Sequence, residues 1–312
     1  MRRKGWWHLG KAALLLMVVG GCDGGGGGGG ESPFRGEQKI AVDVSLRLAV
    51  EPVVEMFSRT YPQARLKVFY LPQEEAIAGL LADSFAAVVV CRPLTPAESL
   101  DLAQTKIIPK RVQVAWDGIA VIGHPDRRDS TLRWDSLRAW LSRPETPYTF
   151  VVEAGAGSSV YMYLRDSVLA GETLKAKLYR LDSLPAILDF VERNVRAVGF
   201  VGASWVCNPR DSVGQSFLER VRVFWVAGKG SVDYYPPVAG YIRPGYYPLV
   251  RPVWALNREP RMGVATSFVA FLAGPEGQRI LLKAGLFPAR SPVRLIELKE
   301  EQINVGAAEE KQ

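Results

Sequence analysis

One short apolar run restricts the fold of this chain more than any other feature. Residues 85–90, FAAVVV, contain no polar side chain and are followed by Cys91, Arg92 and Pro93. A strand of this composition is buried on both faces, which is typical of a sheet that helices cover on both sides. Strand and helix patterns alternate along the rest of the chain, so we predict an α/β fold built on a parallel sheet.

The remaining elements follow from hydrophobic periodicity. Val50, Val53, Val54 and Phe57 share one face of a helix, and the segment from Thr95 to Glu98 has the sequence of a helix-capping box. We predict further strands at residues 39–44, 66–70, 112–122, 177–181, 197–201 and 220–226, and further helices at residues 74–83, 130–142, 184–194 and 263–284.

The first residues are typical of a bacterial lipoprotein signal. A basic start and a short apolar core precede Val19-Gly-Gly-Cys22, which resembles a lipobox. The apolar core is shorter than the roughly 20 residues that span a bilayer. We therefore predict a signal peptide at residues 1–21, lipidation of Cys22, and a glycine-rich tether at residues 22–36 that holds the protein at a membrane in the cell envelope, facing the periplasm.

Charge and cysteine content exclude several classes of protein. Loss of residues 1–21 removes four basic residues and no acidic one, so the formal charge falls from +7 to +3. Basic and acidic residues alternate along the remainder, which argues against nucleic-acid binding. Cys91 and Cys207 lie in different predicted lobes, so we expect free thiols. No cysteine and histidine cluster has metal-ligand spacing, and we expect no metal and no cofactor.

A strand, a turn of small residues and a helix follow one another at residues 151–165. Gly155 and Gly157 open the backbone, and Ser158 and Ser159 stand at the start of the helix. Unpaired N–H groups and two hydroxyls could then converge on an anion. The alternative is that Ser158 is a helix N-cap and the glycines are a turn.

Three predicted strand ends point to one cleft. Ser45, the Cys91-Arg92 pair and Ser158 each follow a predicted strand, and ligands of open α/β sheets lie beyond the carboxyl ends of strands. The strand at residues 112–122 is long enough to pass between two lobes, with a bend at Asp117-Gly118. We predict a clamshell with two hinge crossings: residues 37–117 and 242–302 form lobe 1, residues 118–241 form lobe 2, and residues 303–312 form a disordered tail.

Eight short motifs give the chain a resemblance to a known family. In order they are AVDVS (41–45), VCRPLT (90–95), IIPK (107–110), VAWDGIAVI (114–122), Ser158-Ser159, AVGFVG (197–202), YPLVRP (247–252) and GQRILLKAGLFP (277–288). Together they resemble the phosphate-binding protein of the phosphate-specific ABC transporter, in a compact lipoprotein form. The resemblance implies a two-lobed periplasmic solute-binding fold of type II, a monomer that binds one phosphate without catalysis and delivers it to a permease.

The resemblance also implies a ligand set. Phosphate would meet Ser45, the N–H of Leu46, Cys91 and Arg92 on lobe 1, and Gly157, Ser158 and Ser159 on lobe 2. Two positions depart from the family. Cys91 stands where well-known members have a hydroxyl residue, and a thiol is a weak donor. Arg92 and Glu153 stand where longer members have an acid and an arginine, so the charges are exchanged across the cleft.

The exchanged charges permit a specific hypothesis. Arg92 could offer its fork to phosphate, and Glu153 could pair with Arg92 and accept a hydrogen bond from a protonated phosphate oxygen, which fully ionised sulfate lacks. The alternative is an Arg92–Glu153 ion pair that never touches the ligand. Asp43 and Asp117 lie on or near the same cleft, where each could cap backbone N–H groups or meet the ligand.

Three other functions compete with phosphate transport. An enzyme would need a nucleophile beside a base, and the mature chain has a single histidine, His124, in a predicted loop. A binding protein of the same fold could instead take sulfate, molybdate or a phosphonate. A tethered sensor or adhesion protein could keep the fold without transport.

Overall fold

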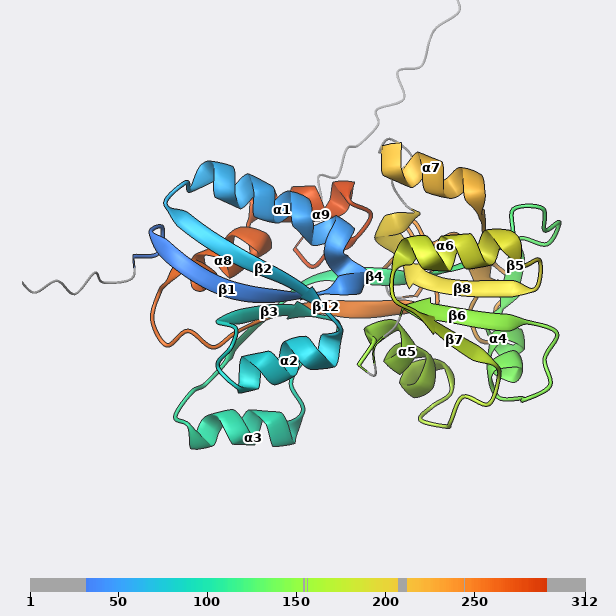
Figure 1. Cartoon of the computed structure of the whole chain (residues 1–312), viewed down its shortest axis with the longest axis horizontal. Coiled ribbons are helices and arrows are strands. Elements are labelled where there is room, and N and C mark those ends of the chain that lie inside the picture. The colour runs from blue at the N-terminus through green and yellow to red at the C-terminus, as the bar shows by residue number, and fades with distance from the viewer. Residues whose placement is uncertain (1–31, 154, 156, 207–211, 244, 291–312) are drawn as a thin grey trace, which may run out of the picture. The chain divides into compact units, whose positions relative to one another are not determined.

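The computed structural model describes residues 32–153, 155, 157–206, 212–243 and 245–290. These residues lie in one compact unit that covers Glu31–Gln312. Strands and helices alternate through most of its length (Figure 1). The predicted signal peptide, Cys22, most of the tether, Cys207 and the tail lie outside the described residues. Among the residues that are described, no helix is both long enough and apolar enough to cross a membrane.

Thirteen strands are named in the described ranges. They are β1 (Gly36–Asp43), β2 (Ala64–Leu71), β3 (Ala87–Val90), β4 (Lys110–Gly123), β5 (Thr131–Arg133), β6 (Thr149–Glu153), β7 (Leu178–Leu181), β8 (Ala197–Gly202), β9 (Arg222–Val223), β10 (Trp225–Ala227), β11 (Tyr234–Tyr235), β12 (Val250–Asn257) and β13 (Phe287–Pro288).

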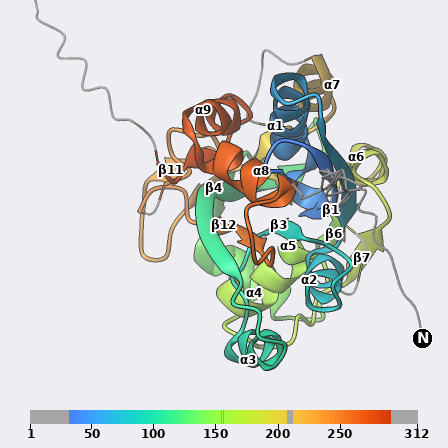
Figure 2. The same ribbon diagram turned by 90° about the vertical axis from the view of Figure 1, so that its left-hand side faces the viewer.

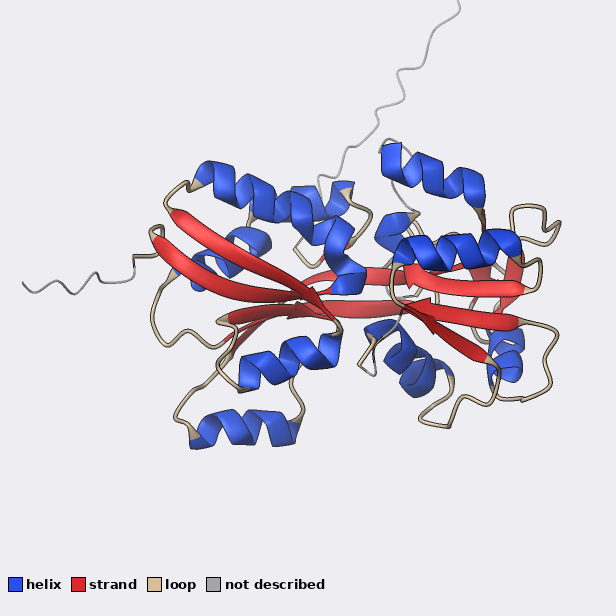
Figure 3. Cartoon of the chain, viewed as in Figure 1, coloured by secondary structure: helices blue, strands red, loops and turns tan. Residues whose placement is uncertain are grey.

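The helices accompany these strands on both faces of the sheet (Figure 3). They are α1 (Arg47–Thr60), α2 (Gln73–Leu81), α3 (Pro96–Gln104), α4 (Trp134–Leu141), α5 (Ser159–Tyr163), α6 (Leu184–Arg193), α7 (Ser212–Arg220), α8 (Val264–Ala273) and α9 (Pro275–Lys283). Three short turns complete the set: the 3-10 turns Val44–Leu46 and Ala203–Trp205, and the π-turn Leu164–Val168.

One long strand joins two halves of the sheet. The strand order is β2-β1-β3-β12-β4-β8-β6-β7. The residues of β4 up to Gly118 pair with β12, and those from Ile119 pair with β8. We call β1, β2, β3, β12, β13, α1–α3, α8 and α9 the first half, and β5–β11 with α4–α7 the second half. The predicted lobe boundaries after residues 117 and 241 stay a prediction.

Apolar side chains fill both faces of each half. In the first half, α1 and α8 pack on one face of the sheet through Phe57 and Phe268, and α2 packs on the other through Ile77. Figure 2 shows α1 and α9 on the side of the sheet opposite to α2 and α3. In the second half, α5 and α6 cover opposite faces. The predicted burial of β3 on both faces is confirmed, since each of its four residues is buried.

The sheet is mixed, so the prediction of a parallel sheet is only partly correct. β1 pairs parallel with β2 and β3, and β6 pairs parallel with β7 and β8. β12 enters between β3 and β4 and is antiparallel to both. Periodicity predicts strands but not their direction, because direction depends on where the chain returns from the second half.

Three predicted elements have different boundaries. The helix predicted at residues 130–142 begins at Trp134, because Thr131–Arg133 is strand β5, paired with β10. The strand predicted at residues 220–226 is the short pair β9 and β10 after α7. The helix predicted at residues 263–284 is two helices, because Gly274 is extended and Pro275 has no N–H to continue the helix.

Candidate functional site

The first contribution to the site comes from the end of β1. The chain leaves β1 at Asp43 and turns through Val44–Leu46, which buries Ser45 at 4% exposure. Asp43 Oδ1 accepts hydrogen bonds from the N–H and the hydroxyl of Ser45, each at 3.0 Å. The Leu46 side chain packs in the core of the first half. Ser45 is therefore held in place by a carboxylate, and Leu46 could offer a ligand only its backbone.

The second contribution comes from the turn after β6. The Ser158 hydroxyl accepts from the N–H of Tyr161 at 3.4 Å, so the alternative interpretation of Ser158 as the N-cap of α5 is confirmed, and its role toward an anion stays a prediction. Gly157 accepts from the N–H of Glu74 at 3.3 Å, and a Cβ at Gly157 would lie 2.4 Å from the Cβ of Glu74. Only glycine permits the two halves to approach this closely. Ser159, the first residue of α5, then faces the first half.

A buried arginine connects these two contributions. The Arg251 side chain, at the start of β12, is 2% exposed and pairs with the fully buried Asp117 of β4 at 2.8 Å. Its Nη1 donates to Ser159 Oγ at 2.7 Å, and its Nη2 donates to Ser45 Oγ at 2.7 Å. The two serine hydroxyls lie 3.2 Å apart. One guanidinium therefore contacts hydroxyls from both halves.

The sequence interpretation gave no role to Arg251. Arg251 lies in a largely apolar strand, near Val250 and Val253. An arginine is almost never fully buried unless it is paired, so this position indicates a buried ion pair. The partner could have been sought in Asp117, the acid within the other long apolar strand. Arg251 lies at the amino end of its strand. The rule that ligands lie beyond the carboxyl ends of strands therefore does not predict it as a site residue.

Two buried acids at this point keep open hydrogen-bonding capacity. Asp43 Oδ2 and Asp117 Oδ1 have no partner at normal hydrogen-bond geometry among the described residues, although the Cys91 thiol lies beside Asp43 and the N–H of Ala203 lies beside Asp117. Burial raises the pKa of Asp117, against the opposing effect of the Arg251 charge. Glu153 is the last residue of β6, and its pKa is raised to about 7. Burial makes the largest contribution and the charge of Asp43 adds to it, whereas the charge of Arg251 opposes both. The site therefore combines one cation with acceptors suited to a ligand that carries a proton.

The predicted pairing of Arg92 with Glu153 is wrong. The Arg92 guanidinium donates to Glu74 at 2.6 Å and 2.9 Å and to Glu98 through two bonds of 2.8 Å. Glu98 also completes the predicted capping box with Thr95, which is confirmed. These partners all belong to the first half, and Glu74 lies on α2, outside the strand-end pattern. The fork of Arg92 is therefore filled by its own acidic neighbours.

Cys91 lies against the core rather than in the open. Its N–H donates to Gln73 Oε1 at 2.8 Å, and its side chain joins the apolar cluster of the first half. Burial raises the pKa of the thiol, so the neutral form is favoured. The expected free thiol is confirmed for Cys91.

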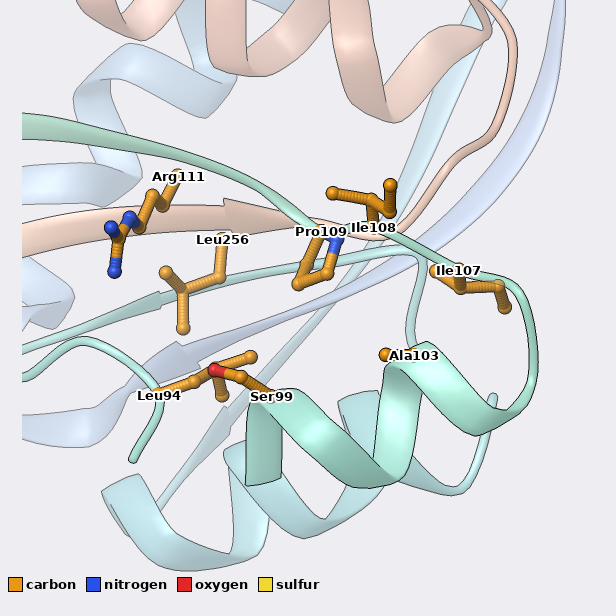
Figure 4. A pocket seen from close by; sticks show the side chains of 8 residues that line it. All are labelled: Leu94, Ser99, Ala103, Ile107, Ile108, Pro109, Arg111 and Leu256. Atoms are coloured by element: carbon orange, nitrogen blue, oxygen red, sulfur yellow. The ribbon is translucent and has the colours of Figure 1, made fainter. Parts of the chain in front are cut away.

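A cavity of about 310 Å³ brings several predicted residues together between the halves. Its lining includes Cys91, Arg92, Ser159 and Arg251. A separate pocket of about 330 Å³ lies on the first half between α3 and β12 (Figure 4). Its walls are mainly apolar, with Ser99 and Arg111 as polar members, and it contains none of the predicted site residues. Within the described ranges, no three histidine, cysteine or acidic side chains form a group that could hold a metal ion.

Comparison with known proteins agrees with this architecture. The family model described as a PBP superfamily domain matches residues 28–276. The chain belongs to the PBP superfamily. No curated protein matches it.

Solved structures of the PBP superfamily fold include phosphate receptors. A phosphate ABC transporter substrate-binding protein with bound phosphate from Clostridium perfringens is 19% identical, with a TM-score of 0.66 over 82% of this chain and 100% of that one. An ABC-type phosphate transport receptor from Vibrio cholerae is 17% identical, with a TM-score of 0.58 over 80% of this chain and 99% of that one.

The same fold also occurs in a regulatory protein. The regulatory domain of OxyR2 from Vibrio vulnificus, in its reduced form, is 10% identical, with a TM-score of 0.52 over 80% of this chain and 96% of that one. These likenesses confirm the predicted α/β solute-binding fold and the predicted resemblance at the level of fold. The PBP superfamily thus supplies the scaffold, and the ligand must be argued from the site.

Proposed function

We propose that the chain is an extracytoplasmic lipoprotein that binds inorganic phosphate between its two halves and delivers it to an ABC transporter permease. The observation that carries the proposal is the meeting of Arg251 with Ser45 and Ser159, one hydroxyl from each half. A guanidinium and the Ser159 hydroxyl are donors that suit a tetrahedral oxyanion, and Ser45 can become a third donor once its O–H leaves Asp43. Their origin in separate halves makes the ligand a bridge between them.

The proposed ligands are Ser45, Ser159 and Arg251, with the backbone N–H groups of Leu46 and Gly157 and the hydroxyl of Ser158 as further donors, since the N–H of Ser158 already donates to the carbonyl of Gly155. The two hydroxyls are 3.2 Å apart, so an anion can contact both only after they separate. A phosphate oxygen would then replace the serine oxygens as acceptor for Arg251. Binding would therefore be coupled to a change in the distance between the halves.

The acids support phosphate rather than sulfate. The open oxygens of Asp43 and Asp117 can accept a hydrogen bond from a protonated phosphate, whereas fully ionised sulfate has no proton to give and would be repelled. Glu153 is a further candidate for this role, because its raised pKa lets it exchange protons near neutral pH. If Glu153→Gln leaves the preference for phosphate over sulfate unchanged, Glu153 does not accept the hydrogen bond that distinguishes protonated phosphate from sulfate.

Calorimetry tests the proposal directly. The full chain, purified in detergent, is titrated with phosphate, sulfate and molybdate. We expect saturable heat with phosphate at micromolar protein and a weaker response to the other anions. No saturable heat with phosphate would overturn the proposal, and a stronger response to molybdate or sulfate would favour another oxyanion.

The anchor requires its own experiment. We expect the native chain to sediment with membranes and Cys22→Ser to appear in the soluble envelope fraction, because the substitution removes the thiol that would carry lipid. Release of the native chain into the soluble fraction would contradict lipidation at Cys22, whereas sedimentation of both proteins would mean that the uncleaved residues 1–21 hold the variant at the membrane.

A further inference from the structure

The cavity between the halves is larger than inorganic phosphate requires. Its volume is about 310 Å³. Phosphate has five heavy atoms and occupies on the order of two to three water volumes of about 30 Å³ each. A cavity of roughly 300 Å³ or more is instead typical of small organic ligands. An oxyanion at Arg251 would leave most of this space open.

The cavity has one polar end, formed by Ser159 and the Arg251–Asp117 pair, and a largely apolar remainder. Arg251 and Ser159 lie at the end that the proposed phosphate site shares. Apolar lining comes from both halves, through Pro93, Pro252 and Met162. The ring of Tyr163 joins this lining while its hydroxyl donates to the carbonyl of Pro248 at 3.2 Å. The cavity therefore presents apolar surface next to an anion site.

The other charged lining groups already have partners. Arg92 is held by Glu74 and Glu98. Asp166 receives two hydrogen bonds from Arg165, at 2.5 Å and 2.9 Å. Because Arg92 and Asp166 are each neutralised by a neighbouring side chain, neither offers an unpaired charge to a charged substituent of a ligand. The substituent that fits is neutral.

The amide of Gln73 is engaged as well. Its oxygen accepts from the N–H of Cys91 at 2.8 Å, and its nitrogen donates to Glu74 at 3.2 Å. A polar substituent would therefore find few free partners on this wall, and an apolar substituent would lose no hydrogen bond there.

We propose that this cavity receives a small neutral, apolar substituent on the phosphoryl group, so that the chain binds alkylphosphonates or alkyl phosphates in preference to inorganic phosphate. The inference rests on the proposed phosphoryl site at Arg251 and names the class of ligand for that site. Its physical basis is the transfer of the substituent from water to the apolar lining formed by Pro93, Met162, Tyr163 and Pro252.

Calorimetry with matched ligands tests the inference on the full chain in detergent. The ligands are inorganic phosphate, propylphosphonate and propyl phosphate. We expect the two propyl compounds to bind more tightly than phosphate by about 10-fold if half of the propyl surface is buried and by about 50-fold if all three carbons are buried. A difference between the two propyl compounds then identifies whether a phosphonate or an ester is preferred.

A variant that fills the cavity sharpens the test. Met162→Trp should lower the ratio of propylphosphonate affinity to phosphate affinity about 10-fold, because the indole would occupy the space of the substituent. Met262→Trp is the matched control, since Met262 is 60% exposed and lies outside this lining. Ser167→Phe, at another lining position, replaces Met162→Trp if that variant does not fold.

The outcomes separate the two proposals. Saturable binding of phosphate with weaker binding of both propyl compounds would overturn this inference and leave the proposed function standing. An unchanged affinity ratio in Met162→Trp would also overturn it. Binding of the propyl compounds without binding of phosphate would overturn inorganic phosphate as the ligand and support this inference. Binding of none of the three would overturn both.

Discussion

Two arginines line the cavity between the halves, and they differ in what surrounds them. Arg92 is 22% exposed and makes its ion pairs with Glu74 and Glu98, both from the first half. Arg251 is 2% exposed, pairs with Asp117, and donates to serines of both halves. Arg92 therefore fastens α2 and α3 within one half, whereas Arg251 connects the two.

The difference shows that a position at the end of a strand does not make an arginine a ligand group. The two acids around Arg92 compensate its charge and fill its fork. Arg251 has one acid and two hydroxyls, and hydroxyls can exchange one partner for another because each both donates and accepts. The arginine with replaceable partners is the better candidate for an anion.

The largest expected effect comes from Arg251→Met. Loss of the cation leaves Asp117 buried without its partner, which costs about 3–5 kcal/mol of unfolding free energy. We also expect phosphate affinity to fall by more than about 100-fold, since a charge-assisted fork is lost. Chemical denaturation and calorimetry measure the two effects.

Arg258→Met is the matched control for this variant. Arg258 is also buried and pairs at 3.1 Å with Asp83, which lies just after the end of α2 in the first half. It should lower stability and leave phosphate affinity unchanged. Equal losses of affinity in the two variants would mean that Arg251 acts through stability alone.

The next effect concerns Glu153 and pH. Its pKa in the folded chain is about 7, above the ordinary value of 4.5, so the folded state holds the proton more tightly than the unfolded state. The stabilisation is complete below about pH 4.5 and is lost as pH rises through about 7. We expect the loss to be roughly 2 kcal/mol after screening by partial exposure.

Glu153→Gln should remove this component of the pH dependence, because the amide does not titrate. The exposed Glu145→Gln is the control and should leave the pH profile as it is. Denaturation midpoints at pH 5 and pH 8 give the comparison. A parent chain that gains stability over this interval, with Glu153→Gln following the same course, would contradict the raised pKa.

A smaller effect is expected from the serines. Ser159→Ala and Ser45→Ala each remove a hydroxyl that contacts Arg251 at 2.7 Å. Phosphate affinity should fall about 10-fold in each variant, as expected for loss of a hydrogen bond to a charged group. The control is Ser267→Ala, since Ser267 is a buried residue of α8 whose hydroxyl has no hydrogen-bond partner among the described residues. If Ser159→Ala binds phosphate like the parent, the second half does not contribute its hydroxyl.

The smallest effect on binding is expected from Arg92→Met. Its acidic partners are partly exposed, with side-chain exposures of 33% for Glu74 and 19% for Glu98, so water can solvate them. We expect about 1 kcal/mol of destabilisation and less than about a 3-fold change in phosphate affinity. An effect on affinity as large as that of Arg251→Met would erase the distinction between the two arginines.

The sequence predicts the site residues whose positions depend on capping and turns between neighbouring residues. Asp43 and Ser45 follow a strand directly, and Ser158 and Ser159 follow a glycine turn, so capping and turn chemistry place them. The partners of Arg92 could not be predicted in this way, because Glu74 reaches it from a helix 18 residues earlier in the chain. Arg251 was missed because the direction of β12 depends on how the chain returns from the second half.

The path of β4 through both halves has a mechanical consequence. Arg251 on β12 pairs in register with Asp117 on β4, next to the residue at which β4 passes from one half of the sheet to the other, and a register shift lies between Val253 and Trp254. Rotation of one half against the other would concentrate torsion in this strand pair. Because Arg251 and Ser45 both belong to the first half, this torsion would separate the guanidinium from Ser159 while its contact with Ser45 is kept, so the link between the halves would break at one hydrogen bond.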